Sequence, residues 1–214
     1  GGLSACFYGP PGTGKTMAAQ VLSRELGLDA YRVDMSRIMD KYIGETEKKL
    51  AELFDAAKDS NAILFFDEAD ALFAKRTEVG DSKDRYANVE TAYLLQRMEQ
   101  HNGISILATN AVQNFDEAFK RRISYMIHMP MPDEQTRQLL WAKAFPPQAP
   151  LEGVNLDFFA KRFELTGSSI KSVALSAAYL AAAKGGPIGR EELIQAVREE
   201  YQKTGRVLME HELY

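Results

Sequence analysis

The chain has 214 residues, of which 45% are hydrophobic and 26% are charged, enough apolar material for one or two domains with buried cores. Its 26 Lys and Arg residues against 30 Asp and Glu residues give a formal net charge of −4, which argues against a protein held on nucleic acid by bulk positive charge. No apolar run approaches the roughly 18 residues that a membrane span needs. The single cysteine, Cys6, cannot form an internal disulfide, so we expect a buried free thiol in a cytosolic protein.

The first 131 residues alternate strand patterns with helix patterns. Short apolar runs predict strands at residues 3–8, 30–35, 63–66, 104–108 and 125–129. Between them, apolar residues recur at helical spacing around residues 18–26, 50–57 and 87–98. The run at residues 63–66 shows no alternation, as expected of a strand covered on both faces. The pattern therefore predicts an α/β domain over residues 1–131, with a parallel sheet and helices on both faces.

The pattern changes at Pro130 and Pro132, which disfavour helix and strand pairing around residue 131. Beyond this point, apolar spacing predicts four helices, around residues 139–140, 158–163, 170–183 and 193–197. We therefore expect a small all-helical domain at residues 132–214. The chain also begins directly ahead of its first motif, which predicts a piece of a longer protein.

A glycine-rich turn follows the first predicted strand. Residues 9–16 read GPPGTGKT, which satisfies G-x-x-x-x-G-K-[ST] between a strand and a helix. Glycines let successive backbone N–H groups turn toward phosphate oxygens, and the helix N-terminus attracts the same anion. Lys15 would contact the outer phosphates and the Thr16 hydroxyl would ligate Mg²⁺. The alternative is an incidental glycine-rich turn, and the absence of an N-K-x-D motif disfavours a small GTPase.

Two adjacent carboxylates, Asp67 and Glu68, end the apolar strand at residues 63–66. Beside a phosphate-binding loop, Asp67 is predicted to hold Mg²⁺. Glu68 is predicted to polarise the water that attacks the γ-phosphate. The alternative is a surface turn or a helix N-terminus, where acidic residues are favoured in any case.

Together these residues resemble an AAA+ ATPase of the AAA clade. The resemblance extends over nearly the whole chain and includes residues 9–16, Asp67 and Glu68, residues 108–110 and 115–123, and the helical tail. Residues 41–50 and 75–98 are similar to bacterial AAA ATPases, some of which are encoded beside contractile injection systems. The resemblance implies a P-loop NTPase sheet followed by a helical lid. It also implies ATP and Mg²⁺ as cofactors and a ring-shaped homo-oligomer, a hexamer in the full-length protein.

The resemblance also assigns roles to single polar residues. Asn110 matches the sensor residue that helps to orient the attacking water. Arg121 and Arg122 match paired arginine fingers, whose guanidinium groups would stabilise charge on the neighbouring subunit's γ-phosphate. Lys171 lies where many AAA+ proteins carry a lid sensor arginine, although the AAA clade often lacks it. The alternatives are a strand-end turn for Asn110, a solvated basic cluster for the arginines and a solvated Lys171.

Residues 41–45, KYIGE, match the first pore loop of the family. There Tyr42, with Ile43 beside it, would grip a polypeptide by apolar contact without reading its sequence. The alternative is that Tyr42 packs locally. Residues 75–86 are rich in both charges and hold either a second pore loop or a loop without contact to substrate.

The sequence thus predicts ATP hydrolysis coupled to remodelling or threading of a protein client through an oligomeric ring. The alternative is an ATP-gated assembly or scaffolding factor without threading, and a nucleic-acid remodelling ATPase is disfavoured by the charge. The predicted catalytic residues are Glu68, Asp67, Asn110, Arg121 and Arg122. The predicted nucleotide-binding residues are Pro11, Gly12, Thr13, Gly14, Lys15, Thr16, Met17 and Lys171. The predicted metal ligands are Thr16 and Asp67, and the predicted pore residues are Tyr42 and Ile43.

Overall fold

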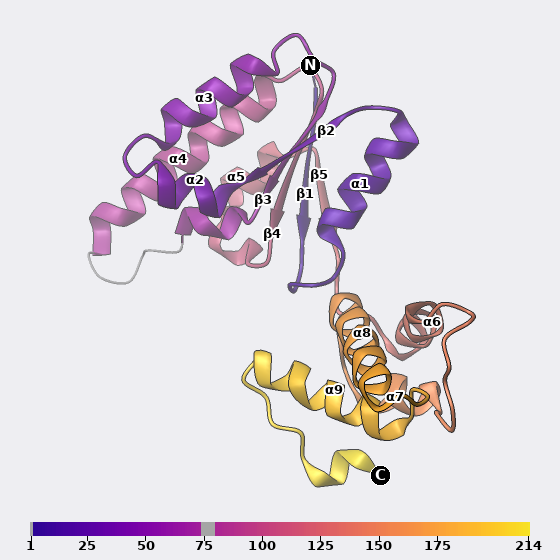
Figure 1. Ribbon diagram of the computed structural model, residues 1–214. Coiled ribbons are helices and arrows are strands. Elements are labelled where there is room, and N and C mark those ends of the chain that lie inside the picture. The colour runs from indigo at the N-terminus through magenta and orange to yellow at the C-terminus, as the bar shows by residue number, and fades with distance from the viewer. Residues whose placement is uncertain (1, 74–79) are drawn as a thin grey trace. The chain divides into compact units, whose positions relative to one another are not determined.

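The computed structural model describes residues 2–73 and 80–214, with only the backbone for residues 80–88. The chain divides into two compact units, Gly1–Pro130 and Met131–Tyr214 (Figure 1). Of the segment predicted as a second pore loop, residues 75–79 and the side chains of residues 80–86 lie outside the described residues.

The first unit is built on a five-stranded parallel sheet with the strand order β2-β3-β4-β1-β5. The strands are β1 (Leu3–Tyr8), β2 (Ala30–Asp34), β3 (Ile63–Asp67), β4 (Ile104–Thr109) and β5 (Tyr125–His128). Because all five run in the same direction, their carboxyl ends meet at one edge, where α/β proteins bind ligands.

Helices cover both faces of this sheet, as Figure 1 shows for α1 on one side and α2, α3 and α4 on the other. The helices are α1 (Lys15–Leu26), α2 (Met35–Lys41), α3 (Thr46–Ala56), α4 (Gly80–Gln100) and α5 (Glu117–Arg122). Two 3₁₀ turns, η1 (Ala69–Phe73) and η2 (Val112–Asn114), follow β3 and β4. Side chains alternate along β1: Phe7 packs in the cluster with Ala19 of α1, and Cys6 packs in the cluster with Phe54 of α3. The predicted α/β fold is confirmed.

The thiol of Cys6 is 1% exposed and is not part of a disulfide. Burial, with the nearby Asp70 carboxylate, raises the pKa of this thiol to about 12. The expectation of a buried free thiol is confirmed.

The structure contains two helices that the sequence pattern did not predict, α5 and, directly after the second strand, α2. The second strand ends at Asp34 instead of continuing to residue 35, and α2 begins at once. The Asp34 carboxylate accepts hydrogen bonds from the Ser36 backbone N–H at 3.0 Å and from the Ser36 hydroxyl at 2.6 Å. This side-chain cap satisfies a free N–H of the first turn and stops the strand. Met35 therefore enters the core as the first helical residue, fully buried.

The second unit consists of four helices, as predicted, and a short C-terminal turn. These are α6 (Glu134–Ala144), α7 (Leu156–Arg162), α8 (Gly167–Lys184), α9 (Arg190–Lys203) and the 3₁₀ turn η3 (Glu210–Leu213). Its core surrounds the fully buried Trp141. None of the helices in the described part of the chain combines the length and the apolar character that a bilayer span requires.

Candidate active site

The glycine-rich loop leaves β1 and enters α1 with backbone angles that favour glycine. Gly9 has a φ of 152°, and a Cβ there would lie 2.0 Å from the Met129 carbonyl oxygen. Gly14 precedes α1 with a φ of 98° in the left-handed region. The loop therefore curls back over the end of β1, so that the first turn of α1 points its free N–H groups into it.

Lys15 is buried inside this loop, at 8% exposure. Its ammonium group donates to the Gly9 carbonyl at 2.9 Å and to the Pro10 carbonyl at 2.7 Å. Burial lowers the pKa of Lys15, and nearby carboxylates, led by Asp70, oppose this shift. The structure thus holds a positive charge at the centre of the loop, where an anion would bind. Pro11, Gly12 and Met17 of the predicted nucleotide-binding set lie exposed around it.

The end of β3 meets the start of α1 at the predicted metal ligands. The Thr16 hydroxyl donates to Asp67 Oδ2 across 3.2 Å, although the two residues are 51 positions apart. Both groups are oxygen donors, the type of ligand that Mg²⁺ prefers. The structure therefore brings the glycine-rich loop and the acidic pair to one place.

Glu68 lies at the turn between β3 and η1. With a φ of 56°, it is the only residue other than glycine in the left-handed region among the residues that the structure describes. Its backbone N–H donates to Asp67 Oδ1 at 2.8 Å. Partial desolvation and the nearby carboxylates of Asp67, Asp34 and Asp70 raise the pKa of Glu68. A raised pKa and a strained backbone are both typical of functional carboxylates.

Asn110 follows the last residue of β4, at the same edge of the sheet. β4 lies between β3 and β1, and the Gly9 N–H donates to the Thr109 carbonyl at 3.2 Å. This bond places Asn110 between the glycine-rich loop and the acidic pair. The Asn110 side chain is exposed and has no hydrogen bond to the described residues, so its amide is available to a ligand.

The two arginines at the end of α5 differ in their surroundings. Arg122 forms a two-pronged pair with Glu99 of α4, through Nε at 2.9 Å and a terminal nitrogen at 2.8 Å. Arg121 is exposed and has no ion pair or hydrogen bond within the described part of the chain. Of the predicted pair, Arg121 is therefore the one free to reach another molecule.

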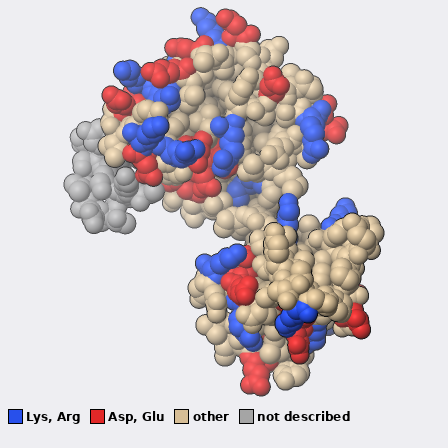
Figure 2. Space-filling model, viewed as in Figure 1, with Lys and Arg blue, Asp and Glu red and all other residues tan. Residues whose placement is uncertain are grey.

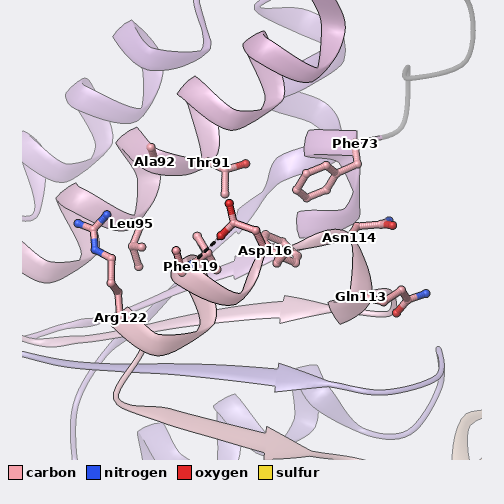
Figure 3. A pocket seen from close by; sticks show the side chains of 11 residues that line it. Phe73, Thr91, Ala92, Leu95, Gln113, Asn114, Asp116, Phe119 and Arg122 are labelled. Carbon is pink, nitrogen blue, oxygen red and sulfur yellow. Dashed lines mark hydrogen bonds between the residues drawn. The ribbon is translucent and has the colours of Figure 1, made fainter. Parts of the chain in front are cut away.

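A hollow of about 400 Å³ lies beside Arg122, between α4 and α5. In Figure 3 the side chains of Thr91 and Asp116 point toward one another within it. Asp116 caps α5 by accepting from the Phe119 N–H at 2.7 Å. The Thr91 hydroxyl is buried and has no partner among the described residues. None of the residues that line the hollow belongs to the glycine-rich loop or to the acidic pair.

The predicted pore residues occupy different environments. Tyr42 is half-buried and packs against the core, and the ammonium groups of Lys41 and Lys49 lie 5.7 Å and 4.9 Å from its ring centre. Ile43 is 73% exposed. The exposed apolar side chain of this loop is thus Ile43, whereas Tyr42 packs in part against the core.

Lys171 lies in the second unit, exposed near the start of α8. Thr166 caps this helix by accepting from the Ser169 N–H at 3.1 Å. The contact of Lys171 with a nucleotide stays a prediction.

Two residues of the site were missed from the sequence. Arg32 on β2 binds Asp67 Oδ2 through Nε and a terminal nitrogen, each at 2.9 Å. Asp70 in η1 accepts hydrogen bonds from the segment around Asn110. The signal for Asp70 was its position three residues after Asp67. The signal for Arg32 was weaker, because it required knowing that β2 pairs with β3.

The first unit also matches a known family. A family model described as "ATPase family associated with various cellular activities (AAA)" matches residues 5–131, the span that contains the loop, the acidic pair, Asn110 and both arginines. The chain belongs to the AAA family of ATPases. The predicted membership of the AAA family and the predicted enzyme class, an ATPase, are confirmed. The similarity of residues 41–50 and 75–98 to bacterial AAA ATPases stays a prediction.

Curated relatives of this AAA chain carry the name "Proteasome-activating nucleotidase". The protein of Methanoregula boonei is 35% identical over 202 residues, which cover 90% of this chain and 46% of the relative. That of Saccharolobus islandicus strain M.14.25 is 32% identical over 200 residues, covering 89% and 51%. That of Saccharolobus solfataricus is 31% identical over 202 residues, covering 90% and 51%. The chain spans about half the length of the curated relatives it matches.

Proposed function

We propose that this AAA protein hydrolyses ATP and uses the reaction to remodel or thread a protein client through a ring of identical subunits, a hexamer by the family resemblance. The observation that carries the proposal is the 3.2 Å contact between the Thr16 hydroxyl and Asp67 Oδ2. It brings the phosphate-binding loop and the acidic pair close enough to share one nucleotide.

In this proposal, residues 1–131 form the ATPase base and residues 132–214 form the lid. Backbone N–H groups of the loop and Lys15 bind the phosphates. Thr16 and Asp67 would hold Mg²⁺, which supplies positive charge against the phosphate oxygens. Glu68 accepts the proton of the attacking water, and Asn110 orients that water. The role of Lys171 as a lid sensor enters the proposal through the family resemblance alone.

Three observations support a protein client over a nucleic acid. Ile43 exposes an apolar side chain in the loop that resembles a pore loop. Positive and negative side chains are interspersed on the face drawn in Figure 2, whereas nucleic-acid binding favours a basic surface. The relatives named proteasome-activating nucleotidase suggest a role directed at proteins. The proposal also includes a cytoplasmic location and the similarity of residues 41–50 and 75–98 to bacterial AAA ATPases, some of which are encoded beside contractile injection systems.

Glu68→Gln tests the hydrolytic site. The amide cannot accept a proton, so hydrolysis by the full-length protein should fall by roughly 10²–10⁴-fold, while binding of a fluorescent ATP analogue persists. Glu164→Gln is the matched control, because Glu164 is exposed and lies in the second unit. Near-normal turnover by Glu68→Gln would overturn the assignment of the base.

Ile43→Ser tests threading against the alternative, an ATP-gated assembly factor. The measurement is the ratio of protein client unfolded to ATP hydrolysed. Loss of the exposed apolar side chain should lower this ratio if the loop grips the client. Leu175→Ser, at an exposed apolar residue of α8 with 57% exposure, is the control. A ratio unchanged by Ile43→Ser, with rings that still form and dissolve with ATP, would favour the assembly factor.

A further inference from the structure

The carboxylate of Asp70 joins the ends of two neighbouring strands. Its Oδ2 accepts from the Asn110 backbone N–H at 2.9 Å. Its Oδ1 accepts from the Ala111 N–H at 3.2 Å and from the Thr109 hydroxyl. Asp70 itself lies in η1, two residues after Glu68. Three donors from the segment after β4 therefore converge on one side chain from the segment after β3.

Backbone pairing does not reach this place. The ladder between β3 and β4 ends at the pair Phe66–Leu107, whereas β4 continues beside β1 as far as Thr109. The two strand ends that carry Glu68 and Asn110 are thus beyond the hydrogen bonds that fix the register of the strands. The Asp70 carboxylate supplies hydrogen bonds across this gap.

The turn between Glu68 and Asp70 is short and anchored. The Ala71 N–H donates to the Glu68 carbonyl at 3.0 Å, and Ala69 and Leu72 are buried in the core at 0% and 4% exposure. A displacement of Asp70 would therefore be passed to Glu68, because the packed segment between them has little freedom.

We propose that Asp70 is a positioning residue for hydrolysis, whose carboxylate holds Asn110 at a fixed place relative to Glu68. The inference rests on the proposed function, in which Glu68 and Asn110 act on the same water. An ionised carboxylate accepts on both oxygens, whereas an amide has one acceptor oxygen and two N–H donors. Asp70→Asn therefore keeps the size of the side chain and faces one of the three donors with another donor.

A double-mutant cycle tests the inference in the assembled full-length protein with Asp70→Asn, Asn110→Ala and both together. Asp70→Asn should lower kcat by about tenfold or more and leave the KM for ATP within about twofold, because a misplaced group slows the reaction step more than binding. The double variant should be no slower than Asn110→Ala, since Asp70 is proposed to act through the Asn110 side chain, which Asn110→Ala already removes. If the fold-loss of kcat in the double variant equals the product of the two single-variant losses, the inference is overturned.

Amide hydrogen exchange supplies a readout that does not depend on activity. Asp70→Asn should speed exchange at the Asn110 amide, whose acceptor is Asp70 Oδ2. A smaller change is expected at the Ala111 amide, because it also donates to the Thr109 hydroxyl oxygen at 3.0 Å. Ser60→Ala is the matched control: the Ser60 hydroxyl oxygen accepts from the Ala62 N–H at 2.9 Å, just before the opposite end of β3. It should leave exchange at both amides and kcat unchanged. Unchanged exchange in Asp70→Asn would overturn the inference.

Thr109→Val replaces Asp70→Asn in the cycle if the latter does not fold. It removes the Thr109 hydroxyl, which donates to Asp70 and accepts from the Ala111 N–H at 3.0 Å, while the Asp70 carboxylate keeps its bond to the Asn110 N–H. A smaller loss of kcat is therefore expected, and an unchanged kcat would overturn the inference. Failure of the proposed function gives a different result, since the unaltered protein would then lack ATP hydrolysis or Glu68→Gln would retain it. An active protein, an inactive Glu68→Gln and a fully active Asp70→Asn would contradict the Asp70 inference alone.

Discussion

At the scale of the residue, Glu68 combines a left-handed backbone with a carboxyl group among other carboxyl groups. Its φ of 56° costs free energy that the surrounding packing must offset. Its pKa is raised by partial desolvation and by Asp67, Asp34 and Asp70. The folded state therefore disfavours the ionised form of Glu68. A general base needs this ionised form.

This shift predicts a dependence of stability on pH. Because the folded state holds the Glu68 proton more tightly than the unfolded chain, the stability that this proton contributes is present in acid and is lost as the pH rises through the raised pKa. Glu68→Gln removes the charge, so at pH 7 its Tm should exceed that of the unaltered protein by a small margin. The difference should shrink toward about pH 4, the ordinary range of a glutamate pKa.

Thermal unfolding of both proteins between pH 4 and pH 8 measures this effect, with Glu164→Gln as the control for an exposed glutamate. Equal Tm values at pH 7, or a difference that grows in acid, would contradict the proposed cause of the shift.

At the scale of the element, the helical unit is tied together by a buried arginine. Arg137 of α6 is 7% exposed and donates from Nε to the Ala160 carbonyl at 2.7 Å and from a terminal nitrogen to the Pro132 carbonyl at 2.9 Å. These bonds join α6 to α7 and to the segment that opens the unit. Trp141, the chain's single tryptophan, is fully buried in the same unit and reports its unfolding.

Arg137→Met should therefore destabilise the helical unit. Methionine keeps an apolar stem of similar length, but the Ala160 and Pro132 carbonyls lose their donors. Each lost partner costs about 1–3 kcal/mol, so the urea midpoint followed by Trp141 fluorescence should fall. Ser60→Ala in the first unit should leave this midpoint unchanged. An Arg137→Met midpoint equal to that of the unaltered protein would show that the two bonds contribute nothing net.

At the scale of the whole molecule, the exposed guanidinium of Arg121 predicts how subunits would share an active site. Arg122 is occupied by Glu99 of its own subunit, so Arg121 is the arginine expected to complete a neighbour's site. Loss of such a group costs about a thousandfold or more in rate. In a ring, the catalytic base and the arginine of one complete site would then belong to different subunits.

Mixing two inactive variants tests this arrangement. Arg121→Ala keeps Glu68, and Glu68→Gln keeps Arg121, so mixed rings should contain some complete sites and regain measurable hydrolysis. Mixing Arg121→Ala with a variant that carries both Arg121→Ala and Glu68→Gln should regain none, because no subunit supplies the arginine. If mixed rings form, as shown by mass spectrometry, and hydrolysis stays absent, the site is not completed by Arg121 of a neighbour.

The fold class and the main residues of the candidate site could be predicted from the sequence alone, because the patterns that indicate them are local. The alternation of strand and helix patterns predicted the α/β fold with helices on both faces. The glycine spacing at residues 9–16 and the Asp67–Glu68 pair predicted the main parts of the candidate site. Each of these predictions depends on periodicity or on residues close together in the sequence, so it can be made without knowing the tertiary structure.

Other contacts and burial patterns depend on segments that are distant in the sequence and adjacent in the tertiary structure. The pairing of Arg32 with Asp67, the bonds of Asp70 to the end of β4 and the burial of Tyr42 beside the exposed Ile43 depend on strand order and on packing. The helix at Met35–Lys41 was missed because one Asp34 side-chain cap outweighed a continuing strand pattern. Motifs therefore predicted which groups the site contains, whereas the tertiary fold determined which of them touch, because hydrogen bonds and burial depend on distance in space and not along the chain.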